Sequence, residues 1–176
     1  MKMRLILGTI SCVAIWWAAT ASYAQKATDA DKDFAKAAME GGNAEVQLGT
    51  LAQQKSMSAD VKHFGEMMVA DHGKLNQDMA PIAQSLGVTP PTGTSMVAKA
   101  EEAKLKMMSG DSFDKAYIKD MVEDHRKDLA EFKKEAATAT NPELRKAAEH
   151  GVKVVSEHLQ MAEKMAQNHN IEVASD

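Results

Sequence analysis

The sequence contains a single cysteine, Cys12, and it lies within an N-terminal segment that we expect to be removed. The rest of the chain then has no disulfide, thiol nucleophile or thiolate metal ligand, so its stability has to come from packing. The motifs Gly-x-Ser-x-Gly, His-Glu-x-x-His and Cys-x-x-Cys-His are absent, as is the phosphate-binding loop. These absences give no support to the familiar kinds of hydrolytic catalysis or to covalently attached haem.

The first 24 residues have the pattern of a secretion signal. Lys2 and Arg4 precede an apolar run over residues 5–21, and Ser22-Tyr23-Ala24 follows as a small-x-small cleavage site. We expect cleavage after Ala24, which leaves residues 25–176 as one domain in the periplasm or another exported location. A retained membrane anchor is the alternative, but the apolar run is short for one.

The charge of the chain is acidic. The formal net charge is −4, and removal of the leader takes away two basic residues and no acids, so the mature domain has 19 basic and 25 acidic residues. This balance argues against a nucleic-acid partner, because nucleic acids select basic surfaces. Peripheral association with the membrane or envelope is compatible with export, and the oligomeric state is left open.

Beyond the leader, the chain is rich in Ala, Glu, Lys, Met and Gln, which favour helix, and it has no sustained two-residue alternation. We therefore predict an all-α domain. Asn141-Pro142-Glu143 is a strong helix start, whereas Pro81 should kink its helix or divide off the last turn. The expected helices cover about 29–54, 59–86, 96–108, 111–139 and 142–169, with Ser58 and Asp111 as N-caps and a fraying tail from residue 170.

Short connections make the first two long helices antiparallel neighbours, and the last two likewise. The Pro/Gly-rich linker 87–95 and the short helix after it let the second helical hairpin fold back on the first. The expected architecture is a four-helix bundle with a short extra helix in the central crossover. The segments 68–74 and 121–127 both read Met-Val-x-Asp-His-x-Lys, which suggests two related hairpins.

Each long helix has an apolar stripe at heptad spacing, and one polar residue interrupts each stripe: Glu45, His72, His125 and His158. The stripes are Phe34, Ala38, Gly41, Glu45, Leu48 and Ala52; Val61, Gly65, Met68, His72, Leu75, Met79, Ile82 and Leu86; Ile118, Val122, His125, Leu129, Phe132 and Ala136; and Leu144, Ala148, Gly151, Val155, His158, Ala162 and Met165. Helix rise brings the two residues of the first hairpin to within roughly 6 Å in height, and those of the second to within roughly 3 Å. Unpaired polar groups cost several kcal/mol in an apolar core, and a shared metal ion would satisfy all four. We therefore predict one mononuclear metal site with these four ligands.

Neutral imidazole and carboxylate suit Zn, Fe, Mn, Ni or Cu(II) and select poorly among them. A metal-free network is the alternative, in which the histidines bond to Glu45, Tyr117 and trapped water. Without Glu45, three histidines and a water would leave a coordination position open for redox or hydrolytic chemistry, so enzymatic activity is left open.

Three acids each immediately precede a stripe histidine: Asp71, Asp124 and Glu157. We expect them to be solvated flanking residues, and the alternative is that they accept hydrogen bonds from histidines on adjacent helices.

The other three histidines are expected at the surface: His63, His150 and His169. Eleven methionines follow the leader, and core packing is preferred over Cu(I) ligation or sacrificial oxidation.

An ordered series of short motifs spans most of the chain: 41–49 (GGNAEVQLG), 69–72 (VADH), 113–118 (FDKAYI) with His125, and 157–159 (EHL). This series resembles a family of exported bacterial ferritin-like domains of unknown function, whose members are labelled outer-membrane or periplasmic proteins. The resemblance covers about 33–166 and implies a ferritin-like four-helix bundle with an N-terminal signal. It implies no established activity.

Di-iron sites of ferritin-like bundles use Glu-x-x-His on two helices. Here Val69 and Val155 stand three residues before His72 and His158, so the bridging glutamates are missing. A single metal ion fits better. The function expected from the sequence is metal sequestration, sensing or stress protection, and the alternative is a metal-free interaction bundle.

Overall fold

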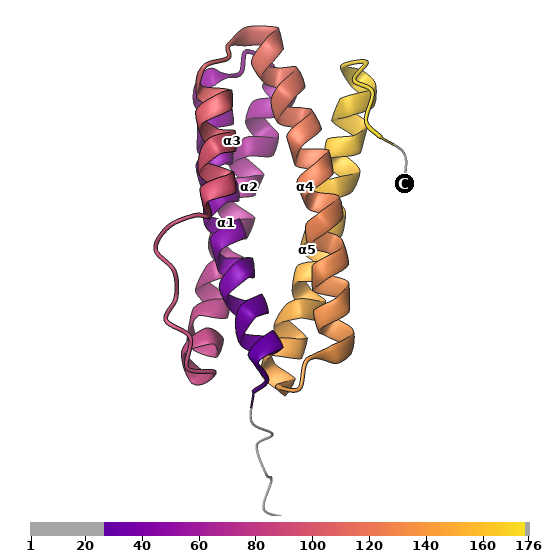
Figure 1. The fold of residues 1–176 in the computed structure, drawn as a ribbon. Helices are drawn as coiled ribbons and strands as arrows, with labels where there is room; N and C mark the ends of the chain where they lie inside the picture. Colours follow the sequence, from indigo (N-terminus) through magenta and orange to yellow (C-terminus); the bar gives the residue numbers. More distant parts are fainter. Residues whose placement is uncertain (1–26, 175–176) are drawn as a thin grey trace, which may run out of the picture.

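The computed structural model describes residues 27–174, so the predicted leader and its cleavage site lie outside the described residues. Residues 27–174 contain helices and no strands, which confirms the all-α prediction (Figure 1). None of the helices in this part is both long and apolar enough to cross a membrane. The helices are α1 (Asp29–Lys55), α2 (Ala59–Ser85), α3 (Met96–Lys106), α4 (Gly110–Thr138) and α5 (Pro142–Asn168).

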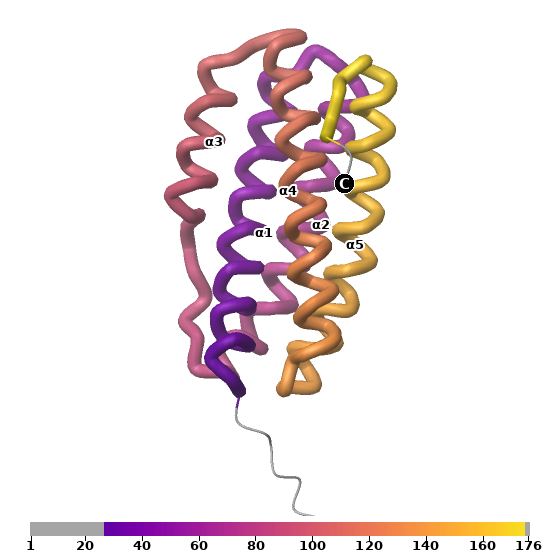
Figure 2. Tube along the Cα trace, turned by 45° about the vertical axis from the view of Figure 1, so that its right-hand side comes forward, coloured from indigo at the N-terminus to yellow at the C-terminus, as the bar shows by residue number. Residues whose placement is uncertain are grey.

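The bundle consists of two helical hairpins, α1–α2 and α4–α5, which lie side by side (Figure 1). The crossover between them runs back along the bundle and carries α3 on its outside, against α1 and α4 (Figure 2). Because of this return, α2 and α4 run in the same direction (Figure 1). Asn43 fixes the linker by donating to the carbonyls of Pro91 and Gly93, both at 3.1 Å.

The helix ends follow capping chemistry, with some differences from the prediction. Asn141 caps α5 as expected, and its Oδ1 accepts from the N–H groups of Glu143 and Leu144 at 2.9 Å. Ser58 precedes α2, but its side chain makes no capping hydrogen bond. The N-cap of α4 is Ser109, not Asp111, because the helix begins one residue earlier than Asp111.

Pro81 does not divide off the last turn of α2, because the helix continues through it to Ser85. The exposed position of Pro81 leaves its ring directed away from the packed side of the helix. The tail does not fray at residue 170: Asn170 takes a positive φ of 52°, and the N–H of Ile171 donates to the carbonyl of Ala166 at 2.8 Å. This is a Schellman motif, and it turns Ile171 onto the core.

Two glycines, Gly49 on α1 and Gly65 on α2, allow the backbones of these helices to approach each other closely. A Cβ atom at Gly49 would lie 2.6 Å from the carbonyl oxygen of Gly65, and one at Gly65 would lie 2.6 Å from the carbonyl oxygen of Gly49. The backbones of α1 and α2 therefore touch at this level, which a larger residue on either helix would prevent.

The apolar core has two parts. One surrounds Phe64 and Tyr117 at the α1–α2 turn, and the other surrounds Met39, Met79 and Leu144 near the α4–α5 turn. The stripe predicted on α5 is buried throughout, from Leu144 to Met165. Between the two parts of the core lie the buried polar residues that the sequence singled out.

Candidate metal centre

Three of the four predicted residues meet in the bundle interior. His72 on α2, His125 on α4 and His158 on α5 are 4%, 0% and 1% exposed. Their ring centroids lie 5.2–5.7 Å apart, and each ring has a nitrogen within 4.8 Å of the nitrogens offered by the other two. Two imidazole ligands of one zinc ion are about 3.4 Å apart in tetrahedral geometry, so closing on an ion requires a movement of about 1 Å.

In the rings of His125 and His158, hydrogen bonds to neighbouring helix atoms determine which nitrogen carries the proton. Nδ1 of His125 donates to the carbonyl oxygen of Met121 at 2.9 Å, and Nε2 of His158 donates to Oδ2 of Asp71 at 2.9 Å. These bonds set the tautomers and leave Nε2 of His125 and Nδ1 of His158 with free lone pairs. Both nitrogens, and Nε2 of His72, are buried without a hydrogen-bond partner in the described chain.

Burial keeps the rings of His72 and His125 neutral. Burial, reinforced by the neighbouring rings of His125 and His158, lowers the pKa of His72 well below its ordinary value. Burial also lowers the pKa of His125 to about 3, with a contribution from His158, although the hydrogen bond to Met121 opposes the shift. Neutral imidazole is the form that binds metal, so these two residues are ready ligands at neutral pH.

An aromatic wall closes one side of the three-histidine site. The Phe64 ring on α2 lies 6.4 Å from the His125 ring and 6.1 Å from the His158 ring, centroid to centroid. Phe64 in turn packs edge-on against Tyr117 at 6.3 Å. Phe64 and Tyr117 thus separate the three histidines from water on the side of the α1–α2 turn.

Glu45 does not join this group: the atoms within 4.8 Å of one another belong to the three histidines. It is 4% exposed, and within the described chain its Oε2 has no hydrogen-bond partner. Burial raises its pKa well above the ordinary value, and the charges of Asp128, Asp124 and Glu101 add to this. Glu45 thus lies beside an acidic group on α3 and α4, and its role as a ligand stays a prediction.

The expectation for the flanking acids was wrong for Asp71. Its side chain is 46% exposed but accepts the hydrogen bond from His158, across from one hairpin to the other. Asp124 pairs instead with Lys127 at 3.0 Å and shares a hydrogen bond with Glu101. Glu157 is exposed, as expected. The hydrogen bond of Asp71 to a histidine on an adjacent helix was the alternative considered from the sequence. Sequence alone could not distinguish it from a solvated position, because the contact depends on how the two hairpins dock.

Of the remaining histidines, His63 and His150 are exposed, as expected. His169 is only 19% exposed at its side chain, and its Nε2 lies 3.0 Å from Oδ2 of Asp60. The Schellman turn that follows α5 holds His169 against the start of α2, which sequence periodicity does not reveal.

A cavity of about 490 Å³ opens between the hairpins and reaches His72. Its walls come from the N-terminal half of α1, the C-terminal halves of α2 and α4, and the first turns of α5. Several stripe positions that the sequence assigned to the core line this cavity and are only partly buried, including Phe34, Gly41 and Phe132. The small residues Ala37, Ala38 and Gly41 could have indicated this cavity from the sequence, because larger side chains would be needed to fill the space between the hairpins.

Comparison with known proteins identifies relatives of this bundle. The family described as a domain of unknown function, DUF4142, matches residues 18–165. No curated protein is significantly similar in sequence. Two solved structures share the fold, both at 15% identity and both matched over 98% of their own length.

One is a DUF305 protein from Streptomyces coelicolor, described as a candidate secreted protein, with a TM-score of 0.70 over 84% of this chain. The other is a DUF305 fragment from Deinococcus radiodurans, with a TM-score of 0.71 over 81% of this chain. At this identity the likeness concerns the fold alone. The family match covers most of the sequence, and the chain belongs to the DUF4142 family.

Proposed function

We propose that the protein is an exported helical bundle that holds one divalent transition-metal ion at His72, His125 and His158. The observation that carries the proposal is the group of three buried histidines, which offer ring nitrogens within 4.8 Å of one another and each have a buried ring nitrogen without a partner in the described chain. Leaving such groups unpaired costs free energy, which an ion would recover. Sequestration, sensing and stress protection are the roles that suit such a site.

The chain supplies three nitrogen ligands and orients them. The carbonyl of Met121 and the carboxylate of Asp71 hold two of the rings, as is usual for metal-binding histidines. Zn, Fe, Mn, Ni and Cu(II) all accept imidazole. A bound ion would supply positive charge and an open coordination position, which water or Glu45 could fill.

The fold class and location belong to the same proposal. Two antiparallel hairpins joined by a long crossover suit a ferritin-like bundle, but Val69 and Val155 stand where di-iron sites need glutamate. Export to the periplasm, with cleavage after Ala24, is supported by the leader pattern and by the description of the Streptomyces coelicolor neighbour.

Elemental analysis of protein purified from its native compartment tests the metal site. We expect about one equivalent of metal, lost on His72→Ala, His125→Ala or His158→Ala and retained in the exposed-histidine controls His63→Ala and His150→Ala. Chelator should lower the melting temperature of the native protein and leave that of the metal-free variants unchanged.

The alternative function is a metal-free bundle in which the polar core fixes helix register. Protein that contains no metal, fails to bind added Zn²⁺, Ni²⁺ or Cu²⁺, and melts at the same temperature with and without chelator would favour this alternative.

A further inference from the structure

The cavity between the hairpins is maintained by the sequence. A Cβ atom at Gly41 would meet no described atom within 4 Å, so the helix could carry a larger residue there without a clash. On the opposite side, Phe132 packs over Gly151, where a Cβ would lie 2.2 Å from Cε1 of the ring. Phe132 also contacts Phe34 edge-on, with centroids 5.1 Å apart. Phe34 and Phe132 therefore form an aromatic side of the cavity.

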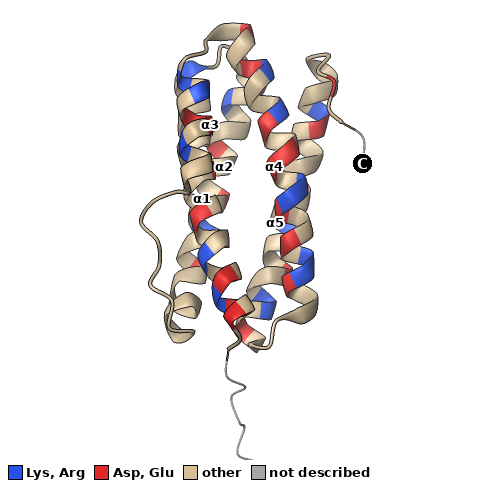
Figure 3. Cartoon of the chain, viewed as in Figure 1, with Lys and Arg blue, Asp and Glu red and all other residues tan. Residues whose placement is uncertain are grey.

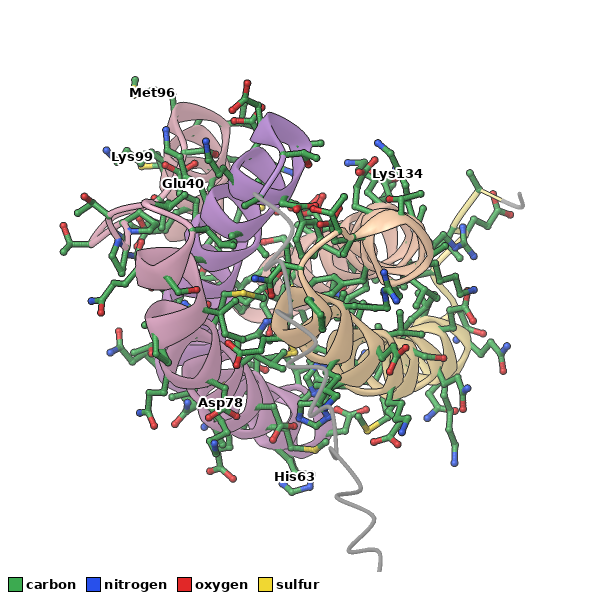
Figure 4. All side chains as sticks on the ribbon, turned by 90° about the horizontal axis from the view of Figure 1, so that it is seen from below. Glu40, His63, Asp78, Met96, Lys99 and Lys134 are labelled. Atoms are coloured by element: carbon green, nitrogen blue, oxygen red, sulfur yellow. The ribbon has the colours of Figure 1, made fainter. Side chains whose placement is uncertain are left out.

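The cavity is acidic. Figure 3 shows acidic residues along the lower part of α1 and along α4, the two helices that supply four of the five acids lining the cavity. Among the described lining residues there is one lysine, Lys134, and it points to the periphery of the bundle when viewed along its axis (Figure 4). His150 is exposed at the margin of the cavity. The acids that line the cavity are Asp33, Asp78, Asp128, Glu131 and Glu135.

Glu135 has the least exposed side chain of these acids. It is 6% exposed, and its Oε1 has no hydrogen-bond partner in the described chain. Burial, together with the negative charge of Asp31 and a hydrogen bond between the two side chains, raises its pKa to about 7. Asp31 is already held by Thr28 and Thr140, which keep its own pKa low despite burial. Within the described residues Glu135 forms no ion pair, and the charge of Lys134, which pairs with Glu131, only partly offsets the rise in its pKa.

We propose that this cavity binds a small organic cation with an apolar body. The ammonium group would lie at Glu135, and the body would lie against Phe34, Phe132 and Met79. Cations favour both carboxylates and aromatic faces, and the volume is in the usual range for small-molecule sites. Asp128 lies seven residues before Glu135 on α4, or about 10 Å along the helix, so it adds negative charge to the cavity but does not contact the same ammonium group.

The position proposed for the ammonium group is remote from the three histidines. Glu135 lies ten residues beyond His125 on α4, or about 15 Å along the helix, whereas His72 lines the other end of the cavity. We therefore expect metal-free protein to bind the cation. The test is therefore made in the presence of chelator, where failure of the metal proposal has no effect on the result.

The experiment compares phenylbutylamine with phenylbutanol and phenylbutyrate by calorimetry. We expect the amine to bind at least tenfold more tightly than the alcohol, and the carboxylate to bind more weakly than either. Glu135→Gln should weaken amine binding at least tenfold and leave alcohol binding unchanged. The exposed-acid control Glu66→Gln should bind the amine as the native protein does.

Gly41→Leu tests the location, because it fills the cavity from a position that has room and improves helix propensity. It should remove binding of the amine and raise the melting temperature. Equal affinities for the amine and the alcohol would overturn the cation assignment. Amine binding that survives in a folded Gly41→Leu protein would overturn the location.

Discussion

Asp71 on α2 and His158 on α5 connect the two helical hairpins through a hydrogen bond of 2.9 Å between Oδ2 and Nε2. The bond holds the proton of the imidazole on Nε2 and leaves Nδ1, which is buried without a partner in the described chain, with a free lone pair. A partly exposed carboxylate thereby controls the orientation of a buried ring.

The first prediction concerns this bond. Asp71→Asn keeps the size of the side chain but removes its charge, so we expect metal affinity to fall by about 10- to 100-fold, as for other acceptors that orient metal-binding histidines. Competition titration with a chromophoric chelator measures the change. Glu157→Gln alters the exposed acid next to His158 and serves as the control. Equal affinity in Asp71→Asn and native protein would contradict this role.

The second prediction concerns Glu135 and pH. Its pKa in the folded protein is about 7, above the ordinary 4.5. Between these two values the folded state holds a proton that the unfolded state has released, so stability falls as pH rises through this window. Glu135→Gln mimics the protonated form and can still donate to Asp31. We expect it to be about 1 kcal/mol more stable than native protein at pH 8 and similar to it near pH 4.5.

Urea denaturation at the two pH values measures this difference. A variant that is less stable than native protein at pH 8 would show that the Glu135 carboxylate is stabilising in its ionised form.

The third prediction concerns protonation of the core of the metal-free protein. The pKa of His125 is about 3 when folded and 6.5 ordinarily, so only the unfolded state takes up this proton in between. Its contribution to stability is complete above pH 6.5 and is lost as pH falls, at up to about 1.4 kcal/mol per pH unit. His125→Phe should show a shallower loss between pH 6.5 and pH 4.5. The exposed-histidine control His63→Phe should keep the native slope.

The fourth prediction concerns the contact between α1 and α2. Gly49→Ala would place a methyl group 2.6 Å from the Gly65 carbonyl, so we expect a loss of about 1–3 kcal/mol in unfolding free energy. Gly73→Ala is the matched control, since its Cβ meets no described atom within 4 Å. It should gain about 0.5–1 kcal/mol from helix propensity. Chemical denaturation of the two variants distinguishes steric contact from propensity, and two variants of equal stability would contradict the close approach.

Periodicity predicted the parts of the structure that depend on a strong local pattern. On α5, the stripe from Leu144 to Met165 has one clear phase, and every member is buried, including His158. On α1, several phases are compatible with a sequence in which alanine and glycine are frequent. In its first half the buried apolar residues are Ala35 and Met39, not the predicted Phe34 and Ala38, whereas in its second half the predicted Glu45, Leu48 and Ala52 are buried.

Contacts between the hairpins could not be predicted, because they depend on rotation and offset in docking. The repeated Asp-His pair illustrates this. Asp71 contacts a histidine of the other hairpin, whereas Asp124 at the matching position bonds to Lys127 and Glu101. The cavity was missed for the same reason, since a stripe predicts which face turns inward but not whether the facing side chains fill the space.

No single hairpin contains the complete set of three histidines: α2 contributes one, and α4 and α5 contribute the others. An ion bound by all three would bridge two units that are otherwise joined covalently by the crossover alone. Cutting the chain within the 87–95 linker would yield two fragments that share a core and that the ion would hold together more tightly, so their association would depend on the metal concentration.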